Sequence, residues 1–582
     1  MECAKEASLI FKCIDGNELI QTNKGLLTIR DAYETIKRTN PGLFVLSDSS
    51  VEKATAVINN GIKDVFEVST EFGNSILATG EHRIVACNDG KLMWKKISDV
   101  KVGDWVPLRL GKWIVKGDFR FDDFNYKPKT HVELGQFPEK EITIPKVMNE
   151  DFATLLGIYI GDGSNHRDGI RFLSGSKDKE LITVTVKLIK KVFKRKALVV
   201  RNRSESYEVS VLSVKLKRFF KYYGMLKKSS REAFIPKPVL MSSERIVTAF
   251  LRGLFSADGS ISHGKYIMLT TSSKRLAREV MSVLWNIGIP CKLNVTKNAF
   301  VLRIYGRIGT IRFKEKVGFI IKKKQKILNS IDVNKIYTRG EKVPIAIPYL
   351  RYMYTRCEGK VKDLIKFALT DIPGKATIKR IAKIYNHTPK ELRKVLEDVN
   401  TIFTRISNIR YVGKRRVYDL HIPTTHVYLV NGFITHNSGG GIGVNYSKLR
   451  PEGDVVASTG GVSSGPVSFM RIIDVVTDVV KAGGKRRGAC MGILEIWHPD
   501  IEKFISAKEK EGVLSNFNIS IAITPDFWKY YEGNKDYPLR NPRDGKIWKT
   551  VNARYLLESA AMMAWKSGDP GVIFLDNLNK RN

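Results

Sequence analysis

A cysteine near the start of the chain and a His-Asn-Ser triplet far along it carry groups that could rearrange a peptide backbone. The thiol of Cys13 stands beside the carbonyl of Lys12, so its attack would convert an amide into a thioester. That step is uphill and needs a site that distorts the peptide or stabilises the developing charge. Ser438 could then accept the acyl group. Cyclisation of Asn437 onto its own carbonyl, with His436 relaying a proton, would cleave the rear junction.

A second set of reactive residues lies in an internal repeat, in which residues 155–163 recur as residues 251–259. Each copy has two small residues four positions apart, namely Gly157 and Gly161, then Gly253 and Ala257. On a helix these residues share one face, so two such helices could pack closely and bring Asp162 and Asp258 together. Two close carboxylates repel each other unless they bind divalent cations, as metal-assisted phosphodiester hydrolysis requires. Two helix-ending Asp-Gly turns without chemistry are the alternative.

Different patterns along the chain indicate the elements that must position these groups. Short strands with turns predict an all-β region from 13 to about 110, and strand-like text returns at 416–420 and 427–430. Each repeat continues into a strand-like segment and an amphipathic helix, at 181–193 and 274–287.

A helical pattern covers residues 341–405. Thr388 and Glu391 form a capping box with Pro389 at the first helical position, which is compatible with a DNA-binding helix-turn-helix or with a helical spacer. Residues 438–582 alternate glycine-rich turns, helices and strands, as α/β enzymes do.

Charge is concentrated in the segment between the two reactive ends. Of the net charge of +39, residues 13–437 carry +35, because residues 1–12 are balanced and residues 438–582 hold 20 basic and 16 acidic side chains. Such a field suits a polyanionic partner, and phosphate contacts would make binding steeply salt-dependent. A lysine-rich, heat-adapted surface is the alternative.

The 6 cysteines are scattered without CxxC or Cys/His clusters, which argues against a zinc site or a disulfide scaffold and fits a reducing compartment. There is no signal-like N-terminus, and no apolar run is long enough to span a membrane. We therefore expect a cytoplasmic protein without a membrane partner.

The residues around the two reactive ends resemble the conserved blocks of inteins. Residues 73–82 are similar to the intein block with a Thr-x-x-His, and residues 417–426 and 431–438 are similar to the two terminal blocks. The resemblance implies an all-β hedgehog/intein horseshoe that splices without a cofactor. Thr79 and His82 would then assist the first acyl shift, and Asp419 and His426 would tune the nucleophile and the coupling of the steps.

The repeat resembles the LAGLIDADG, or DOD-type, motif of homing endonucleases. This likeness implies two αββαββα repeats, Mg²⁺ held at Asp162 and Asp258, and a double-strand cut in duplex DNA at the insertion site of the host gene. Relatives often place a lysine two residues before an Ile-Pro, where this chain has Ala233. Nearby basic residues could replace this lysine or contact DNA. The candidates are Lys227, Lys228 and Arg231 in the first repeat and Lys322, Lys323 and Lys324 in the second repeat.

The flanking sequence resembles class II, adenosylcobalamin-dependent ribonucleotide reductases, on residues 464–470, 483–489 and 498–501. The resemblance implies a nucleotide-binding α/β barrel, with loop candidates Gly439, Gly440, Gly441, Gly483, Gly484, Arg486 and Arg487. Only Cys3 and Cys490 lie outside the insert, so we expect reductase activity to need further chain. Some other nucleotide-binding α/β domain is the alternative.

Together these observations predict a multidomain chain in which an all-β splicing domain is split by an α+β endonuclease and followed by an α/β reductase fragment. The expected parts are host residues 1–12, splicing residues 13–125, a linker at 126–145, an endonuclease at 146–335, a helical part at 336–405, splicing residues 406–437 and host residues 438–582. The alternative function is a DNA-binding insert that does not cut, with an inert β domain, in a nucleotide-binding enzyme.

Overall fold

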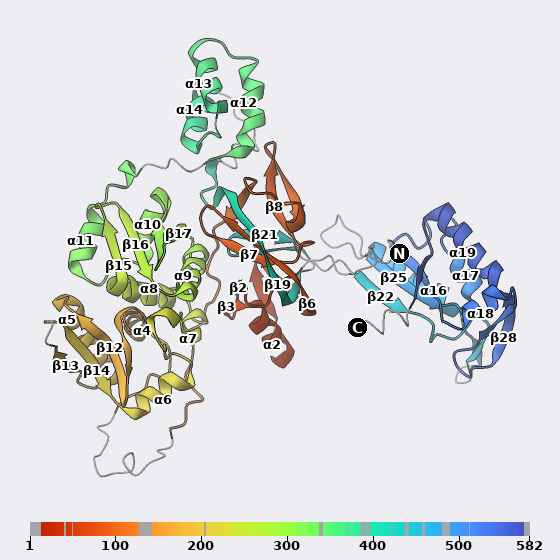
Figure 1. The fold of residues 1–582 in the computed structure, drawn as a ribbon, viewed down its shortest axis with the longest axis horizontal. Helices are drawn as coiled ribbons and strands as arrows, with labels where there is room; N and C mark the ends of the chain where they lie inside the picture. Colours follow the sequence, from red (N-terminus) through yellow and green to blue (C-terminus); the bar gives the residue numbers. More distant parts are fainter. Residues whose placement is uncertain are drawn as a thin grey trace. The chain divides into compact units, whose positions relative to one another are not determined.

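The computed structural model describes residues 13–39, 42–48, 50–126, 142–202, 205–336, 342–370, 372–385, 393, 396–422, 424–436, 441–456, 460–479, 489–510 and 512–574. The chain forms two compact units (Figure 1). The first contains residues 1–422 and 426–438, and the second contains residues 423–425 and 439–582.

One sheet of 13 strands is formed by the N-terminal and C-terminal segments of the first unit. Its strands are β1 (Ile14–Asp15), β2 (Leu19–Thr22), β3 (Gly25–Thr28), β4 (Leu43–Leu46), β5 (Val51–Ala54), β6 (Ala56–Thr70), β7 (Ser75–Ala78), β8 (Arg83–Asn88), β9 (Lys91–Lys96), β10 (Trp105–Arg109), β19 (Thr401–His421), β20 (Val427–Val430) and β21 (Phe433–His436). Helix α2 (Ile29–Thr39) and the short helix η1 (Ile97–Asp99) accompany them.

The strand order interleaves the two ends of the insert: β1-β7-β6-β19-β10-β8-β21-β20-β2-β4-β5, with β3 on β2 and β9 on β8. Strands from residues 14–109 therefore alternate with strands from residues 401–436. The buried side chains of Val65, Val68, Val417 and Leu420 explain the β6–β19 pairing, because each strand presents apolar residues to a shared interior. This pairing brings groups hundreds of residues apart into one site.

Strand β19 begins before residue 406, where the rear splicing segment was expected to start. It starts at Thr401, where it pairs with Arg109 of β10, and the amide of Leu110 donates to the carbonyl of Asn400 at 2.7 Å. The strand is longer than the local sequence pattern indicates because it pairs with β10, which is distant in the sequence.

The inserted region contains two successive units of the order helix–strand–strand–helix–strand–strand–helix. The first is α4 (Glu150–Asp162), β11 (Ser164–His166), β12 (Gly169–Ser176), α5 (Lys179–Phe193), β13 (Leu198–Arg201), β14 (Tyr207–Leu212) and α6 (Val214–Tyr222). The second is α8 (Glu244–Asp258), β15 (Gly259–Ser262), β16 (Tyr266–Thr271), α9 (Lys274–Asn286), β17 (Cys291–Val295), β18 (Phe300–Ile304) and α10 (Gly306–Lys316). Each has a four-stranded sheet, β11-β12-β14-β13 and β15-β16-β18-β17.

Glycines allow α4 and α8 to touch backbone to backbone. A Cβ added at Gly157 would lie 2.1 Å from the carbonyl oxygen of Phe250, and one added at Gly253 would lie 2.1 Å from that of Thr154. No larger residue fits either position without moving the helices. The close approach places the C-terminal ends of α4 and α8 next to each other.

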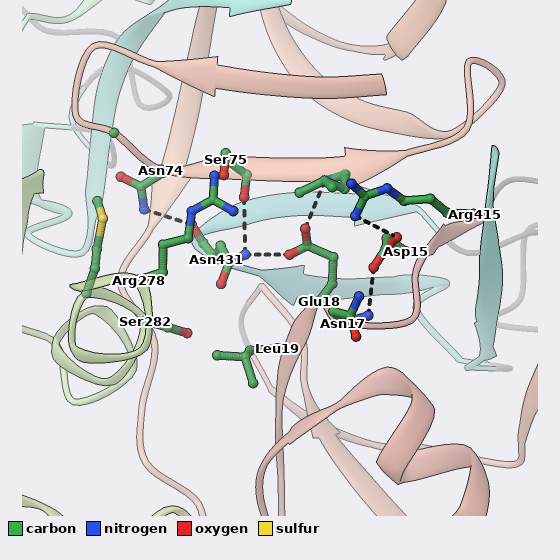
Figure 2. A pocket seen from close by; sticks show the side chains of 13 residues that line it. Asp15, Asn17, Glu18, Leu19, Asn74, Ser75, Arg278, Ser282, Arg415 and Asn431 are labelled. Carbon is green, nitrogen blue, oxygen red and sulfur yellow. Dashed lines mark hydrogen bonds and ion pairs between the residues drawn. The ribbon is translucent and has the colours of Figure 1, made fainter. Parts of the chain in front are cut away.

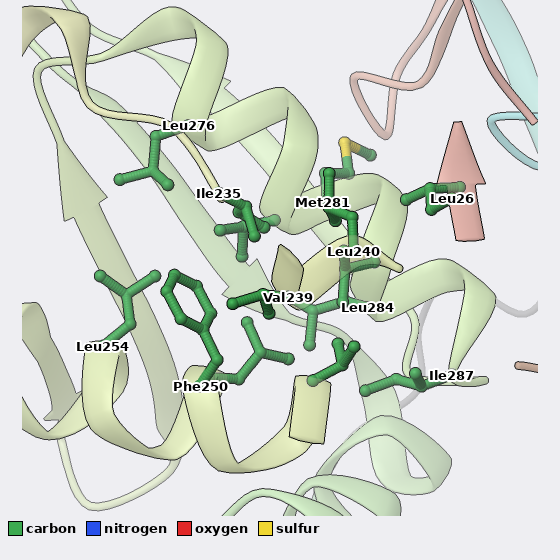
Figure 3. Close-up of a cluster of buried hydrophobic side chains, with 14 of the residues drawn as sticks. Leu26, Ile235, Val239, Leu240, Phe250, Leu254, Leu276, Met281, Leu284 and Ile287 are labelled. Atoms are coloured by element: carbon green, nitrogen blue, oxygen red, sulfur yellow. The ribbon is translucent and has the colours of Figure 1, made fainter. Parts of the chain in front are cut away.

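The splicing and inserted parts share one apolar core. Figure 3 shows Leu26 of β3 near α7 (Lys237–Leu240) and α9, with Leu240 and Met281 beside it. The segment after β10 also packs into the inserted part, since the indole of Trp113 donates to the carbonyl of Ser242 at 2.9 Å and the ring of Phe121 lies 5.0 Å from that of Phe219. Residues after β10, which were expected to belong to the splicing part up to residue 125, therefore contact the inserted part.

A small helical part follows α11 (Lys322–Ser330) and η3 (Val333–Lys335), and it has an apolar core of its own. It contains η4 (Pro344–Ala346), α12 (Ile347–Tyr354), α13 (Gly359–Thr370) and α14 (Lys375–Tyr385). The proposed capping box at Thr388 and Glu391 lies outside the described residues, as does most of the expected linker. The helix-turn-helix therefore stays a prediction.

The second unit is built on a parallel sheet in the order β22 (Gly441–Asn445), β25 (Ala489–Glu495), β26 (Phe517–Ala522) and β29 (Gly571–Ile573). Its helices are α16 (Gly465–Val479), α17 (Ile501–Ile505), α18 (Phe527–Glu532) and α19 (Ala553–Ser567). Two hairpins, β23 (Val455–Val456) with β24 (Gly461–Val462) and β27 (Asp536–Arg540) with β28 (Ile547–Asn552), complete it. This is the expected α/β architecture. Among the described residues, no helix is both long and apolar enough to cross a bilayer.

Candidate functional site

The backbone of Cys13 is clamped by Thr79, which follows strand β7. The amide of Cys13, which is the nitrogen of the Lys12–Cys13 peptide, donates to Thr79 Oγ1 at 3.2 Å. The amide of Thr79 in turn donates to the carbonyl of Cys13 at 3.0 Å. Because Ile14 pairs with both Ala78 and Tyr418, this clamp is held between β7 and β19. Thr79 is thus in contact with the peptide expected to break.

The sulfur of Cys13 is buried in an environment that keeps the thiol protonated. Its side chain lies among Val65, Leu77 and Val417. Burial, followed by the nearby carboxylate of Asp419, raises the pKa of Cys13 to about 12. The side-chain amide of Asn60 opposes this shift by donating a hydrogen bond to Sγ at 3.0 Å. Any reaction of the thiol must therefore move its proton as the new bond forms.

Histidines from the N-terminal and C-terminal parts of the insert are placed by two neighbouring strands, β8 and β21. His82 is fully buried in the turn before β8, where its amide donates to the carbonyl of Thr79 at 3.0 Å. The next residue, Arg83, is the cross-strand partner of His436 at the end of β21. The ring of His436 stacks on that of His426, with centroids 6.1 Å apart. The front and rear groups therefore share one end of the sheet.

Three of the predicted splicing residues are not positioned. Lys12, Asn437 and Ser438 lie outside the described residues, although Cys13 and His436, their immediate neighbours, are described. Asp419 is buried in β19, and one of its carboxylate oxygens accepts the amide of Leu420 at 2.9 Å.

A polar cavity of about 250 Å³ lies between the splicing part and α9 (Figure 2). On its wall, the carboxylate of Glu18 accepts hydrogen bonds from the amide of Leu77 at 3.0 Å and the side-chain amide of Asn431 at 2.6 Å. Burial raises the pKa of Glu18 to about 8, whereas the N–H of Leu77 and the charge of Arg278 act in the opposite direction. Asn431, at φ 49°, begins the turn between β20 and β21. This network fixes the hairpin that carries His436.

Asp162 and Asp258 end α4 and α8 beside the contact between these helices. A Cβ at Gly161 would lie 3.3 Å from Asp258 Oδ2. Burial, and after it the charge of Asp162, raises the pKa of Asp258 to about 7, and burial also raises the pKa of Asp162. The two carboxylates therefore form a coupled, partly desolvated pair, as expected from the repeat.

Two lysines, one from each half, reach this pair in matching positions. Lys227 Nζ donates to the carbonyls of Ile160 and Gly161 at 2.7 and 2.9 Å. Lys324 Nζ donates to the carbonyls of Ser256 and Gly259 at 2.8 and 2.7 Å. Each ammonium thus caps the carbonyl end of one helix, where a cation is favoured. Burial lowers the pKa of Lys227 to about 8 and lowers that of Lys324.

These contacts distinguish among the basic residues that the sequence offered near the aspartates. Lys228, Arg231, Lys322 and Lys323 have exposed side chains, and it is Lys227 and Lys324 that interact with the aspartates. The net charge of a run of lysines does not show which side chain points into the protein, because that depends on the local turn or helix face. The four exposed residues remain predictions as DNA contacts.

The aspartate pair suits a magnesium ion. Mg²⁺ commonly takes one or two protein carboxylates and completes its shell with water and substrate phosphate. Asp162 and Asp258 provide two such carboxylates, and a bound dication would offset the repulsion that raises their pKa values. No cluster of three or more His, Cys, Asp or Glu suited to a metal occurs in the described part of the chain.

The nucleotide-loop candidates of the second unit are largely unplaced. Gly441 begins β22, which runs parallel to β25. Gly439, Gly440, Gly483, Gly484, Arg486 and Arg487 lie outside the described residues.

Comparison with known protein families identifies the insert. The model of the intein splicing domain matches residues 19–437, which is more than half of the chain. The chain belongs to the intein splicing domain family. Residues 428–582 match the model of the ribonucleotide reductase barrel domain. The intein match therefore covers the interleaved sheet from β2 onward, together with everything inserted into it, and begins after Cys13 and β1.

Curated relatives resemble the part that follows the intein. The chain is 54% identical over 155 residues to the vitamin B12-dependent ribonucleoside-diphosphate reductase of Thermoplasma acidophilum, covering 26% of this chain and 20% of the relative. The corresponding reductase of Mycobacterium tuberculosis is 48% identical over 146 residues, covering 25% of this chain and 21% of the relative. The chain thus spans about a fifth of the length of these relatives.

A different relative is similar over more of the chain. It is the DNA-directed RNA polymerase subunit Rpo1C of Methanocaldococcus jannaschii, 24% identical over 410 residues, which covers 64% of this chain and 46% of the relative. An alignment of that extent includes much of the intein.

Sequence reasoning missed Asn60, Tyr428 and Glu18. The phenol of Tyr428 is buried, and its pKa is raised by burial, then by Asp419 and by Cys13, which places it with the splicing groups. Neither Tyr428 nor Glu18 stands in a distinctive pattern. Asn60 stands in Asn-Asn-Gly within a strand-like segment, and this combination is a recognisable signal of a bulge or turn.

Proposed function

We propose that this chain excises residues 13–437 by its own chemistry and joins Lys12 to Ser438. The observation that carries the proposal is the contact between Thr79 Oγ1 and the amide nitrogen of Cys13, in a sheet that also sets Arg83 beside His436. One end of the sheet thereby holds a nucleophile, a clamp on its peptide and the histidines of the rear junction.

The first step replaces a carbon–nitrogen bond by a carbon–sulfur bond. Cys13 Sγ attacks the carbonyl carbon of Lys12, and the thiol proton passes to the departing nitrogen of Cys13. Thr79 fixes that nitrogen and the Cys13 carbonyl, so the peptide cannot rotate away from the buried sulfur. Holding reacting groups in this way can contribute several kcal/mol, about 7–11 in well-oriented intramolecular reactions.

The remaining steps transfer the acyl group and release the intein. Ser438 Oγ attacks the thioester, forms an ester and returns a proton to the Cys13 thiolate. The side-chain nitrogen of Asn437 then attacks the main-chain carbonyl carbon of the same residue. This closes a succinimide and frees the amine of Ser438, with His436 relaying the proton. That amine attacks the ester and gives the Lys12–Ser438 amide.

Intact mass spectrometry of the expressed chain tests this proposal. We expect two products, of 425 and 157 residues, which follow from excision of 13–437. A Cys13→Ala, Asn437→Ala double variant should leave one full-length species, whereas Cys87→Ala, which removes a thiol from β8, should still give both products. A single full-length mass for the unmodified chain, or products from the double variant, would contradict the assignment.

A second activity, cutting of duplex DNA, is favoured by the aspartate pair. Two half-buried carboxylates at paired helix ends, each helix capped by a lysine, would suit a LAGLIDADG-type nuclease that uses Mg²⁺ to polarise a phosphate. The net charge of +35 on the insert, calculated from the sequence, supports duplex DNA as partner. Linearisation of a plasmid that carries the joined host sequence tests this activity, and binding without cutting would favour the alternative.

The part after the intein is inferred to belong to a vitamin B12-dependent ribonucleotide reductase. Its similarity to the two named reductases and its parallel sheet support this inference. Adenosylcobalamin and nucleotides would be ligands of the longer protein, in which the barrel is complete.

A further inference from the structure

Strand β6 has a bulge directly beside the buried cysteine. Opposite β6, Tyr418 pairs with Asn59 and Arg416 pairs with Ile62, so Asn60 and Gly61 together face the single residue between Arg416 and Tyr418. Gly61 has φ 75°, and its amide donates to Asn59 Oδ1 at 3.1 Å. Bulges bend a strand and redirect a side chain, and they are common beside active sites. Here the redirected side chain is that of Asn60.

The redirected amide of Asn60 points at the sulfur. Its Nδ2 donates to Cys13 Sγ at 3.0 Å, although 47 positions separate the residues. An N–H donor stabilises a sulfur that bears negative charge more than a neutral thiol. It also fixes the direction from which the sulfur approaches its own upstream carbonyl.

The surroundings of Cys13 disfavour negative charge on its sulfur, and the Asn60 donor counteracts this effect. Apolar neighbours and the carboxylate of Asp419 both disfavour charge on the sulfur, and they raise the pKa of Cys13. Asn60 is the hydrogen-bond donor that acts in the opposite direction, together with the charge of Lys63. Without Asn60, the sulfur would lose the polar contact at the position where charge develops.

We propose that Asn60 is a further catalytic residue of the first acyl shift, whose amide orients Cys13 Sγ and stabilises the charge that develops on it. The proposal rests on the splicing activity proposed above. The bond changes are those of that step, with the carbon–sulfur bond formed, the carbon–nitrogen bond broken and the thiol proton moved to the nitrogen of Cys13. Asn60 gives up no proton and forms no bond.

The test measures the two ends of the reaction separately in the full chain. In an Asn437→Ala background, dithiothreitol cleaves the front thioester, and its rate reports the first acyl shift across a pH series. In a Cys13→Ala background, cleavage at the rear junction reports Asn437 cyclisation. Asn60→Ala removes the donor, and Asn60→Asp keeps the shape but adds a negative charge beside the sulfur. Asn23→Asp, the same change in the half-exposed turn between β2 and β3, controls for the added charge.

We expect Asn60→Ala to slow front cleavage about three- to ten-fold. Loss of the hydrogen bond makes the thiol more basic, which lowers the fraction present as thiolate. A more basic thiolate is a better nucleophile, and this partly offsets the loss. Asn60→Asp should be slower still at pH values where the new carboxyl is ionised, and the rear reaction should match the parent chain. Front cleavage in Asn60→Asp equal to that of the parent would mean that only the shape of the bulge matters, and would overturn the proposal. Equal rates for Asn60→Ala and the parent would also overturn it. Absence of thiol-dependent cleavage in the parent would refute the splicing activity itself.

Discussion

Burial of an acid raises its pKa at both sites, but the two sites use the effect differently. At Cys13 it keeps the sulfur in the neutral thiol form, which is less reactive than a thiolate. At Asp258 it produces a carboxyl with a pKa of about 7, so a cation can convert the pair to the charged form near neutral pH. Neighbouring polar groups, Asn60 in one case and Lys227 in the other, decide how much charge each site tolerates.

Adjacent lysines provide a matched test of the proposed nuclease site. Lys227 is buried and interacts with both aspartates, whereas Lys228 is exposed. Lys227→Met should lower the rate of plasmid cutting about 10²-fold, the effect of removing one preorganised charge-stabilising group. Its affinity for DNA should hardly change.

Lys228→Met should show the opposite pattern in the same assays. If Lys228 contacts a phosphate, its loss weakens binding and lowers the slope of log affinity against log salt by about 1, with cutting at saturation unchanged. Equal cutting by Lys227→Met and the parent protein would remove Lys227 from the mechanism.

At the scale of elements, the α4–α8 contact determines where the aspartates meet. Helices with ordinary side chains at their contact pack with axes about 8–10 Å apart, and the glycines allow a closer approach. The carboxylates are therefore near each other because of residues one turn or more away from them. The helix ends are in turn held by Lys227 and Lys324, which connect each helix to a segment outside it.

Filling one glycine should separate the helices. Gly157→Ala places a methyl group against the carbonyl of Phe250, and we expect overpacking to destabilise the inserted part by about 1–3 kcal/mol. Differential scanning calorimetry should show its unfolding several degrees lower, and plasmid cutting should fall.

Gly117→Ala is the control for this change, because an added Cβ there meets nothing within 4 Å. It should alter neither measurement. An unchanged unfolding temperature for Gly157→Ala would contradict the close packing of α4 and α8.

At the scale of the whole molecule, the inserted part leaves and re-enters the splicing sheet through a single strand pair. Arg109 of β10 lies opposite Thr401 of β19, and Leu110 is hydrogen-bonded to Asn400. The two chain ends are therefore already as close as the ends of a hairpin. The parts also touch outside this pair, through the packing of Phe72 on Tyr305 with ring centroids 4.7 Å apart and through a hydrogen bond from the amide of Leu293 to the carbonyl of Phe72 at 2.8 Å.

Replacing residues 111–399 by a short Asn-Gly turn should consequently preserve splicing. Such a turn matches the twist of a β-hairpin, and the groups around Cys13 and His436 come from the retained strands. Intact mass should show excision of the shortened intein and joining of the same flanks, while plasmid cutting is lost.

The same deletion with Cys13→Ala should give no excision. A second version of the shortened chain also carries Phe72→Thr, which removes an aromatic ring that the deletion exposes. Comparing the two shortened chains shows whether a failure to splice comes from aggregation or from loss of the chemistry. If both shortened chains are folded by circular dichroism and neither splices, the inserted part has a role in the splicing site.

The amino-acid sequence by itself determined which chemical groups are present and where the repeated unit lies. Cys13, the Thr79–His82 pair, Asp419 and the Asp-Gly repeat are recognisable because each depends on short spacing along the chain. The strands at 427–430 and the helices of the repeat were predicted for the same reason, since hydrophobic periodicity is local.

Only the tertiary structure decided which lysines face the aspartates, where strand β19 begins, and that Asn60 reaches the sulfur. A bulge opposite β19 redirects Asn60, a helix contact buries Lys227 beside Asp258, and pairing with β10 extends β19 to Thr401. Each of these depends on a partner strand or helix far away in the sequence. Burial and cross-strand register are non-local quantities, and they set both the orientation and the pKa of the groups that the local pattern could only name.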